Sequence, residues 1–162
     1  MEKAFGEFDS CEEMNRAAAA QLKEGDIDAV LAIARENGID EEDAQDYIDG
    51  IVEELCTPIM AALGKLKIEA EELAPYGIMN DWITYIQIRC AEDGNVAAGV
   101  MKKDHSLKGC IASLLVWSWK NAKEVDADIK KLAKVNGRCS LGIPDMGTAR
   151  RLITDYYLGE KS

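Results

Sequence analysis

The chain has 162 residues, of which 48% are hydrophobic and 30% are charged, and its formal net charge at pH 7 is −11. A chain of this length can bury about two-thirds of its unfolded surface in one domain, and the apolar content argues against a disordered acidic tail. The negative charge disfavours binding to free nucleic acid and to anionic membranes. The composition therefore predicts a folded, soluble protein with no direct DNA binding and no membrane attachment.

The charge is distributed unevenly along the chain. Residues 1–74 contain 20 acidic and 6 basic side chains, a net charge of −14, whereas residues 75–162 contain 10 acidic and 13 basic side chains. An acidic half of this strength can attract a basic protein surface that normally holds nucleic acid. We expect an acidic helical lobe over residues 1–74 beside an apolar helical core lobe over residues 75–162, meeting at Pro75-Tyr76-Gly77, or one continuous domain.

The sequence has features of a cytoplasmic protein. No apolar run follows Met1-Glu2-Lys3, and the longest uncharged stretch, Gly109 to Trp119, is far shorter than the ~20 residues that a membrane helix needs. The cysteines are odd in number and at least 20 residues apart, which is typical of reduced thiols and not of a zinc site or a disulfide framework. They are Cys11, Cys56, Cys90, Cys110 and Cys139.

Apolar residues at helical spacing and capping residues predict four helices in the first half. The first begins at a capping box formed by Ser10 and Glu13 and ends near Gly25, and the second runs from Asp26 to Gly38. The third is short and acidic; Asp40 is expected to cap it with its side chain, and it ends at Gly50. The fourth pattern extends from Val52 to Leu73, with a bend or a restart where Thr57 can cap and Pro58 suits the first helical position.

The second half is also predicted to be helical. The expected helices are Met79–Cys90, Asn95–Lys103, Leu107–Ser118, Val125–Val135 and a last helix capped by Asp145 and reaching Tyr156, with a glycine-rich loop over residues 136–147. No segment shows the alternation of a strand, so the fold class is all-α with about eight helices. The expected core residues are Trp82, Ile111, Leu114, Leu115 and Leu152.

The sequence contains no recognisable catalytic constellation. His105 is the single histidine, and its neighbours Lys102, Lys103 and Asp104 indicate a solvated polar loop. Carboxylate pairs such as Glu69 with Glu72 lie on one helix face and are expected to be solvated. We therefore expect no enzyme activity, no cofactor and no metal.

The third helix carries the strongest candidate for a partner-binding surface. Six acidic residues occupy ten positions, and Glu53 and Glu54 extend the set; the six are Asp40, Glu41, Glu42, Asp43, Asp46 and Asp49. Over a helix rising 1.5 Å per residue this is about one charge per 2.5 Å, near the ~1.7 Å spacing of duplex DNA. Such a helix could imitate a phosphate backbone, while a merely solvated helix face is the more common explanation.

A basic run lies in the second half, close to Trp117 and Trp119. This run could contact RNA or an acidic protein, or it could pair with the acidic lobe of the same chain, which is the explanation that the charges favour. Its members are Lys120, Lys123, Lys130, Lys131, Lys134 and Arg138.

Several segments together resemble one known family. They are Phe8-Asp9-Ser10-Cys11-Glu12-Glu13-Met14-Asn15, Glu36-Asn37-Gly38-Ile39 running to Asp46-Tyr47-Ile48-Asp49-Gly50, Ser106-Leu107-Lys108-Gly109-Cys110-Ile111, Leu141-Gly142-Ile143-Pro144 and Thr154-Asp155-Tyr156-Tyr157. They resemble the PcfK-like proteins of mobile and conjugative elements of Firmicutes, to which some anti-CRISPR inhibitors of the type II effector nuclease are similar. The resemblance covers nearly the whole chain.

The resemblance implies inhibition of a type II CRISPR effector nuclease, with or without its guide RNA, by stoichiometric binding. Such nucleases hold guide and target in basic channels, for which an acidic surface can compete. One alternative is an accessory adaptor of a conjugative element, which would bind a relaxase or coupling protein and inhibit no nuclease. The other is nucleic-acid binding through the basic half, which the net charge disfavours.

Overall fold

The computed structural model describes residues 3–159, and within them the fold is predominantly helical, as the sequence predicts. The helices are α1 (Cys11–Lys23), α2 (Ile27–Glu36), α3 (Glu41–Ile48), α4 (Pro58–Leu73), α5 (Ile78–Glu92), α6 (Gly94–Met101), α7 (Leu107–Asn121), α8 (Ala127–Ala133) and α9 (Met146–Leu158). The strands β1 (Lys123–Glu124) and β2 (Ser140–Leu141) form an antiparallel pair in which Lys123 faces Leu141. None of these helices combines the length and the apolar character needed to cross a membrane.

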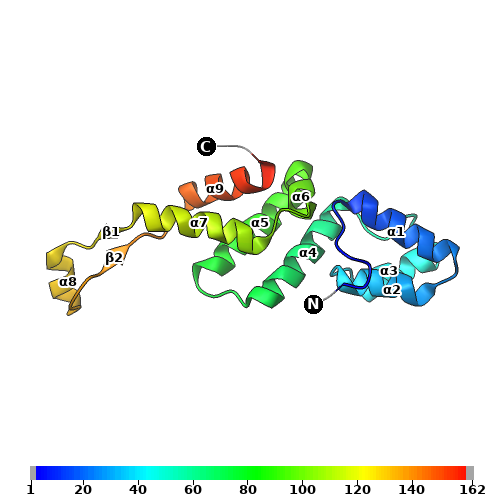
Figure 1. Ribbon diagram of the computed structural model, residues 1–162, viewed down its shortest axis with the longest axis horizontal. Helices are drawn as coiled ribbons and strands as arrows, with labels where there is room; N and C mark the ends of the chain where they lie inside the picture. Colours follow the sequence, from blue (N-terminus) through cyan, green and yellow to red (C-terminus); the bar gives the residue numbers. More distant parts are fainter. Residues whose placement is uncertain (1–2, 160–162) are drawn as a thin grey trace.

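The molecule is elongated, with three parts along its long axis (Figure 1). Helices α1, α2 and α3 form one end, and α4 runs from them into a central group made by α5, α6, α7 and α9. The segment containing β1, α8 and β2, residues 122–145, projects from the far end of α7 and is called the arm below. Acidic helix α3 and the arm therefore lie at opposite ends of the molecule.

Local capping explains where the first helices begin. The Ser10 hydroxyl accepts a hydrogen bond from the Glu13 amide at 3.1 Å, and Asp26 Oδ1 accepts one from the Ala29 amide at 3.0 Å. Both contacts satisfy amides that an α-helix leaves unpaired in its first turn. Asp40 occupies the N-cap position of α3, but its side chain makes no capping hydrogen bond, so this part of the expectation is wrong.

Helix α4 begins at Pro58 and not at Val52. Thr57 Oγ1 accepts a hydrogen bond from the Met60 amide at 3.2 Å, and Pro58 occupies the first turn, where its missing N–H costs nothing. The restart is therefore observed, while residues 51–57 form a non-helical segment. Helix α4 then packs against α1 on one side and against α5, α6 and α7 on the other, so buried core residues continue across the Pro75-Tyr76-Gly77 seam.

The core of the second half matches most of the prediction. Trp82, Ile111 and Leu114 are buried, and Leu152 is partly buried against them. The expectation for Leu115 is wrong, because 65% of this residue is exposed. Helix α7 packs on α4 and α9, and the side of α7 that carries Leu115 and Trp119 faces away from the buried core. A helix without charges between Lys108 and Lys120 need not be buried all round.

Candidate protein-binding surface

The chain reverses its direction after helix α3, which brings the acidic residues of the following segment beside those of the helix. Ala44 and Tyr47 are buried and fix the helix against its neighbours. The chain reverses at Gly50, whose φ of 78° suits glycine, and the amide of Ile51 donates to the Asp46 carbonyl at 2.9 Å. Residues 51–57 consequently return beside α3, and buried Leu55 anchors them to the core.

This return creates an acidic groove with an apolar floor. Asp43 and Asp46 from α3 and Glu53 and Glu54 from the returning segment line a hollow of about 390 Å³. The hollow is completed by Val52, Leu55, Cys56, Thr57 and Met60. Within residues 3–159 none of these four carboxylates forms an ion pair, so their charges are available to a cationic partner. The groove thus combines concentrated negative charge with apolar contact area.

Asn15 of α1 holds the returning segment in place. Its Oδ1 accepts from the Cys56 amide at 3.1 Å, while its Nδ2 donates to the Cys56 carbonyl at 3.0 Å and to Glu54 Oε2 at 3.5 Å. One amide side chain therefore satisfies both backbone groups of Cys56 and approaches a groove carboxylate. Asn15 stands within one of the segments quoted for the family resemblance, but neither spacing nor composition gave it a positioning role.

The groove also affects the residue beneath it. Burial raises the pKa of the Tyr47 hydroxyl, and the negative charge of Glu54 raises it further. Tyr47 is therefore a neutral, buried support for the groove. Its ring fills the core side of α3, while the carboxylates face outward.

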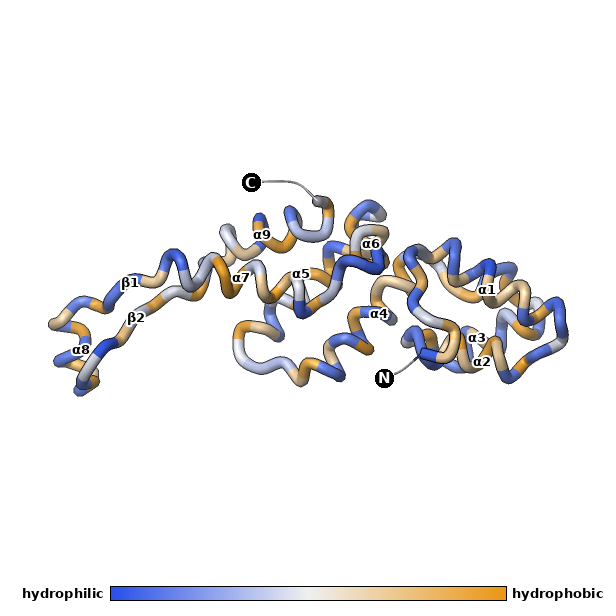
Figure 2. Tube along the Cα trace, in the orientation of Figure 1, coloured by the Kyte–Doolittle hydropathy of each residue, from blue (hydrophilic) through white to orange (hydrophobic). Residues whose placement is uncertain are grey.

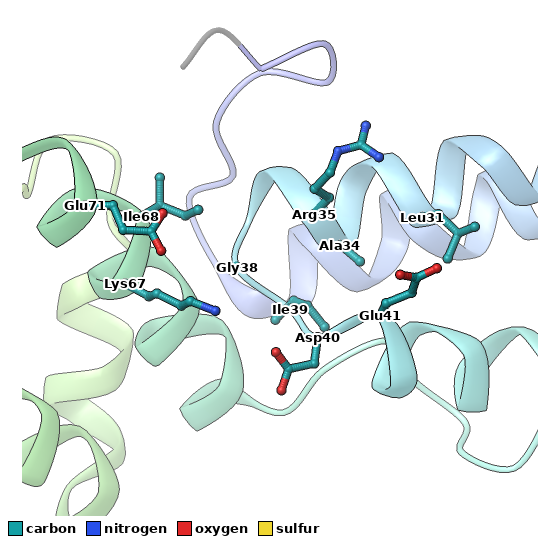
Figure 3. A pocket seen from close by; sticks show the side chains of 10 residues that line it. All are labelled: Leu31, Ala34, Arg35, Gly38, Ile39, Asp40, Glu41, Lys67, Ile68 and Glu71. Carbon is teal, nitrogen blue, oxygen red and sulfur yellow. The ribbon is translucent and has the colours of Figure 1, made fainter.

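A second hollow, near the start of α3, has mixed charge (Figure 3). Its volume is about 420 Å³, and it lies between α2, the start of α3 and α4. Asp40 and Lys67 extend into this space from opposite sides, while Arg35 points outward. Glu41 lines it as well. Because acids and bases share this hollow, it is a weaker attractant for a basic partner than the groove.

The structure therefore divides the eight predicted acidic residues into three groups. Four line the groove, Asp40 and Glu41 line the mixed hollow, and Glu42 and Asp49 are exposed outside both. Asp49 Oδ1 accepts a hydrogen bond from Gln45 Nε2 at 3.0 Å. The closest grouping of acids comes from the chain reversal after α3, and not from a single row along the helix.

The basic run does not pair with the acidic lobe. Its lysines beyond Lys120 lie on the arm, at the other end of the molecule from α3 (Figure 1). Lys130 instead contacts Glu124 of the same arm at 2.8 Å. The expectation of pairing within one chain is therefore wrong, because the elongated fold separates the two charges.

His105 and Glu69 have structural contacts that the sequence did not indicate. His105 is largely buried, with Nδ1 2.6 Å from the Gly99 carbonyl and its ring against Tyr156 and Tyr157, so it is not a solvated loop residue. Glu69 Oε2 accepts from the Leu107 amide at 2.8 Å, and burial raises the pKa of this carboxyl. These two side chains stabilise the turn between α6 and α7.

Lys65 joins the same turn to α4. Its ammonium donates to the carbonyls of Val100, Lys102 and His105 at 2.6, 2.9 and 2.8 Å. All three N–H donors are used, and the cation lies at the C-terminal end of α6, where the helix dipole favours it. The polar cluster is thus explained by fold stability.

Four of the five cysteines are buried, and all five are free thiols. Cys11 Sγ lies 3.8 Å from Cys56 Sγ, which is too far for a disulfide bond. Burial raises the pKa of Cys90 to about 11 and that of Cys110 to about 12, which keeps these thiols protonated. Within residues 3–159 no three histidine, cysteine or acidic side chains are arranged to hold a metal ion.

Comparisons with known proteins leave the geometry as the main guide to function. No protein-family model matches the chain, and neither the curated proteins nor the solved structures show a match.

Proposed function

We propose that this chain is an anti-CRISPR protein that inhibits a type II RNA-guided DNA nuclease by stoichiometric binding. The acidic groove of Asp43, Asp46, Glu53 and Glu54 is the observation that carries the proposal. It competes for a basic channel that otherwise holds the guide RNA or the target DNA. The family resemblance suggests a type II effector nuclease as the partner, and the acidic groove offers a surface that could bind it.

The chemistry of the groove fits lysine and arginine side chains. The carboxylates can form charge-assisted hydrogen bonds with ammonium or guanidinium groups, which are stronger than bonds between neutral groups. Val52 and Met60 offer apolar surface to the methylene stems of those side chains. A nuclease channel lined by such side chains would meet both features at once.

The charge of the whole lobe adds long-range attraction. The net charge of −14 over residues 1–74 steers a basic partner toward this end of the molecule, and this effect weakens as salt rises. The same charge repels free DNA and RNA. Inhibition would therefore act on the nuclease, and not by sequestering its substrate.

A cleavage assay tests the proposal. A type II effector loaded with guide RNA is incubated with this protein from substoichiometric to equimolar amounts, and cleavage of a matched DNA duplex is measured. Loss of cleavage that saturates near one equivalent supports stoichiometric inhibition. Full cleavage at excess protein, across effectors of the different type II subtypes, would contradict it and would favour the adaptor of a conjugative element.

A further inference from the structure

Exposed apolar side chains concentrate at the end of the molecule opposite the acidic groove. Of 15 large hydrophobic residues that the described part of the chain exposes, nine lie between residues 115 and 146. Trp119 is 86% exposed, Leu132 85% and Leu141 71%. The others are Leu115, Val116, Ile129, Val135, Ile143 and Met146. Figure 2 shows hydrophobic stretches along the end of α7 and in the arm.

The arm is ordered by polar contacts that leave its apolar side chains unused. Lys130 donates to Glu124 Oε1 at 2.8 Å and to the Gly137 carbonyl at 2.9 Å, and Glu124 also accepts from the Cys139 amide at 3.3 Å. The Val125 amide donates to the Cys139 carbonyl at 2.8 Å. Helix α8 buries none of its residues. The arm thus has a defined shape but no apolar core of its own.

The exposed apolar area at this end of the molecule is large. Together the nine side chains expose on the order of 1,000 Å² of mainly apolar surface, and apolar side chains gathered in this number at one end of a molecule are typical of an interaction site. A standard interface buries roughly 800 Å² on each partner, so this surface alone could supply one. The end of α7 and the arm therefore have the size and character of a protein interface.

We infer that this surface joins two copies of the chain through their arms and the adjoining outer face of α7. Charge identifies the occupant. Residues 122–145 carry five basic and four acidic side chains, so two arms repel each other little, whereas two acidic lobes of charge −14 repel strongly. Arm-to-arm association keeps these lobes at the two far ends of the assembly. A twofold contact also lets the same apolar patch cover itself.

Two other occupants fit less well. The acidic groove of another copy would pair with the arm lysines but would leave most of the arm's apolar side chains uncovered. Such a head-to-tail contact would also build an open chain of molecules and not a closed dimer. Nucleic acid would require a strong excess of positive charge, which the nearly balanced arm lacks. In the twofold dimer, both acidic grooves remain free, so one assembly could engage two partners.

Sedimentation velocity on the full chain tests the inference without any nuclease present. The wild type is expected at twice its monomer mass of 17.8 kDa at concentrations of about 10–100 µM, a range typical of micromolar self-association. The double variant Leu132→Ser/Leu141→Ser should sediment at the monomer mass. The matched control Ile51→Ser/Tyr76→Ser changes two exposed apolar residues outside this surface and should remain dimeric.

Far-UV circular dichroism establishes that each variant retains the helical fold. A wild type that is monomeric at the highest concentration overturns the inference, and so does an arm variant that remains dimeric. A monomeric wild type that shifts a DNA duplex through the arm lysines would assign the surface to nucleic acid instead. None of these outcomes depends on whether the protein inhibits a nuclease.

Discussion

Replacing Asn15 by alanine tests how the acidic groove is built. The change removes the side chain that accepts from the Cys56 amide at 3.1 Å and donates to the Cys56 carbonyl at 3.0 Å. The Cys56 amide then loses its partner, and the Cys56 carbonyl keeps only the weak donor Cys11 Sγ at 3.5 Å, in a half-buried setting. At roughly 1 kcal/mol for each group, the free energy of unfolding should fall by about 2 kcal/mol.

The assay is equilibrium unfolding in urea, followed by circular dichroism. If the same variant is unfolded by heat instead of urea, a loss of about 2 kcal/mol corresponds to a fall in melting temperature of roughly 4–8 °C for a chain of this size. The matched control is Gln45→Ala, which removes an exposed side chain that contacts only Asp49 among the hydrogen bonds described above. This control should change stability by less than about 0.5 kcal/mol. If Asn15→Ala is equally neutral, Asn15 does not hold the returning segment and the account of the groove is wrong.

Three further predictions concern packing, titration and thiol chemistry. Gly64→Ala should destabilise the fold by about 1–3 kcal/mol, because the added methyl group would meet the carbonyl of Asn37, the residue that follows α2. Gly94→Ala, with open space around it, should be neutral or stabilising in the same urea unfolding assay. Because burial raises the pKa of Glu69, the folded state favours the protonated form of this carboxyl. The free energy of unfolding should therefore decline as pH rises from the ordinary glutamate range through the raised pKa. Glu69→Gln should flatten this decline in unfolding measured across pH, and an unchanged profile would contradict the raised pKa. A thiol reagent should label one cysteine rapidly in the native protein, the partly exposed Cys139, and the other four only after unfolding; rapid native labelling of two or more would disagree with the buried thiols.

The helix boundaries that could be predicted are those set by local chemistry. Ser10 and Asp26 cap the helices that follow them, and Thr57 with Pro58 restarts α4, because each contact joins residues three apart in the chain. Residues 52–55 could not be predicted in the same way. Val52 and Leu55 fit helical spacing, but their segment is held by Asn15, about 40 residues earlier, and such a contact leaves no periodic signal.

The same limit applies to the candidate surfaces. The acidic residues were evident from composition, but the groove depends on the reversal at Gly50, which brings Glu53 and Glu54 back beside α3. The exposed face of α7 reads as core in the sequence because Leu115 lies in the uncharged stretch of this helix, and apolar character alone does not say which neighbour covers it. Tertiary contacts decided both cases.

Association kinetics test the central claim that the groove competes for a basic channel. The variant Asp43→Asn/Asp46→Asn/Glu53→Gln removes three groove charges and spares Glu54, which contacts Asn15. The charge-matched control Glu12→Gln/Glu24→Gln/Asp28→Asn removes three exposed acids elsewhere in the same lobe. Binding to the guide-loaded nuclease is measured at a series of salt concentrations.

The groove variant should associate about tenfold more slowly at low salt, with a weaker dependence on salt, and inhibit correspondingly less, because charges at an interface act mainly on the association rate. The control should lose much less, since its charges contribute only to long-range steering. Equal loss in the two variants would mean that total charge, and not the groove, drives binding. A groove variant that binds and inhibits like the wild type would place the contact surface elsewhere and contradict the account.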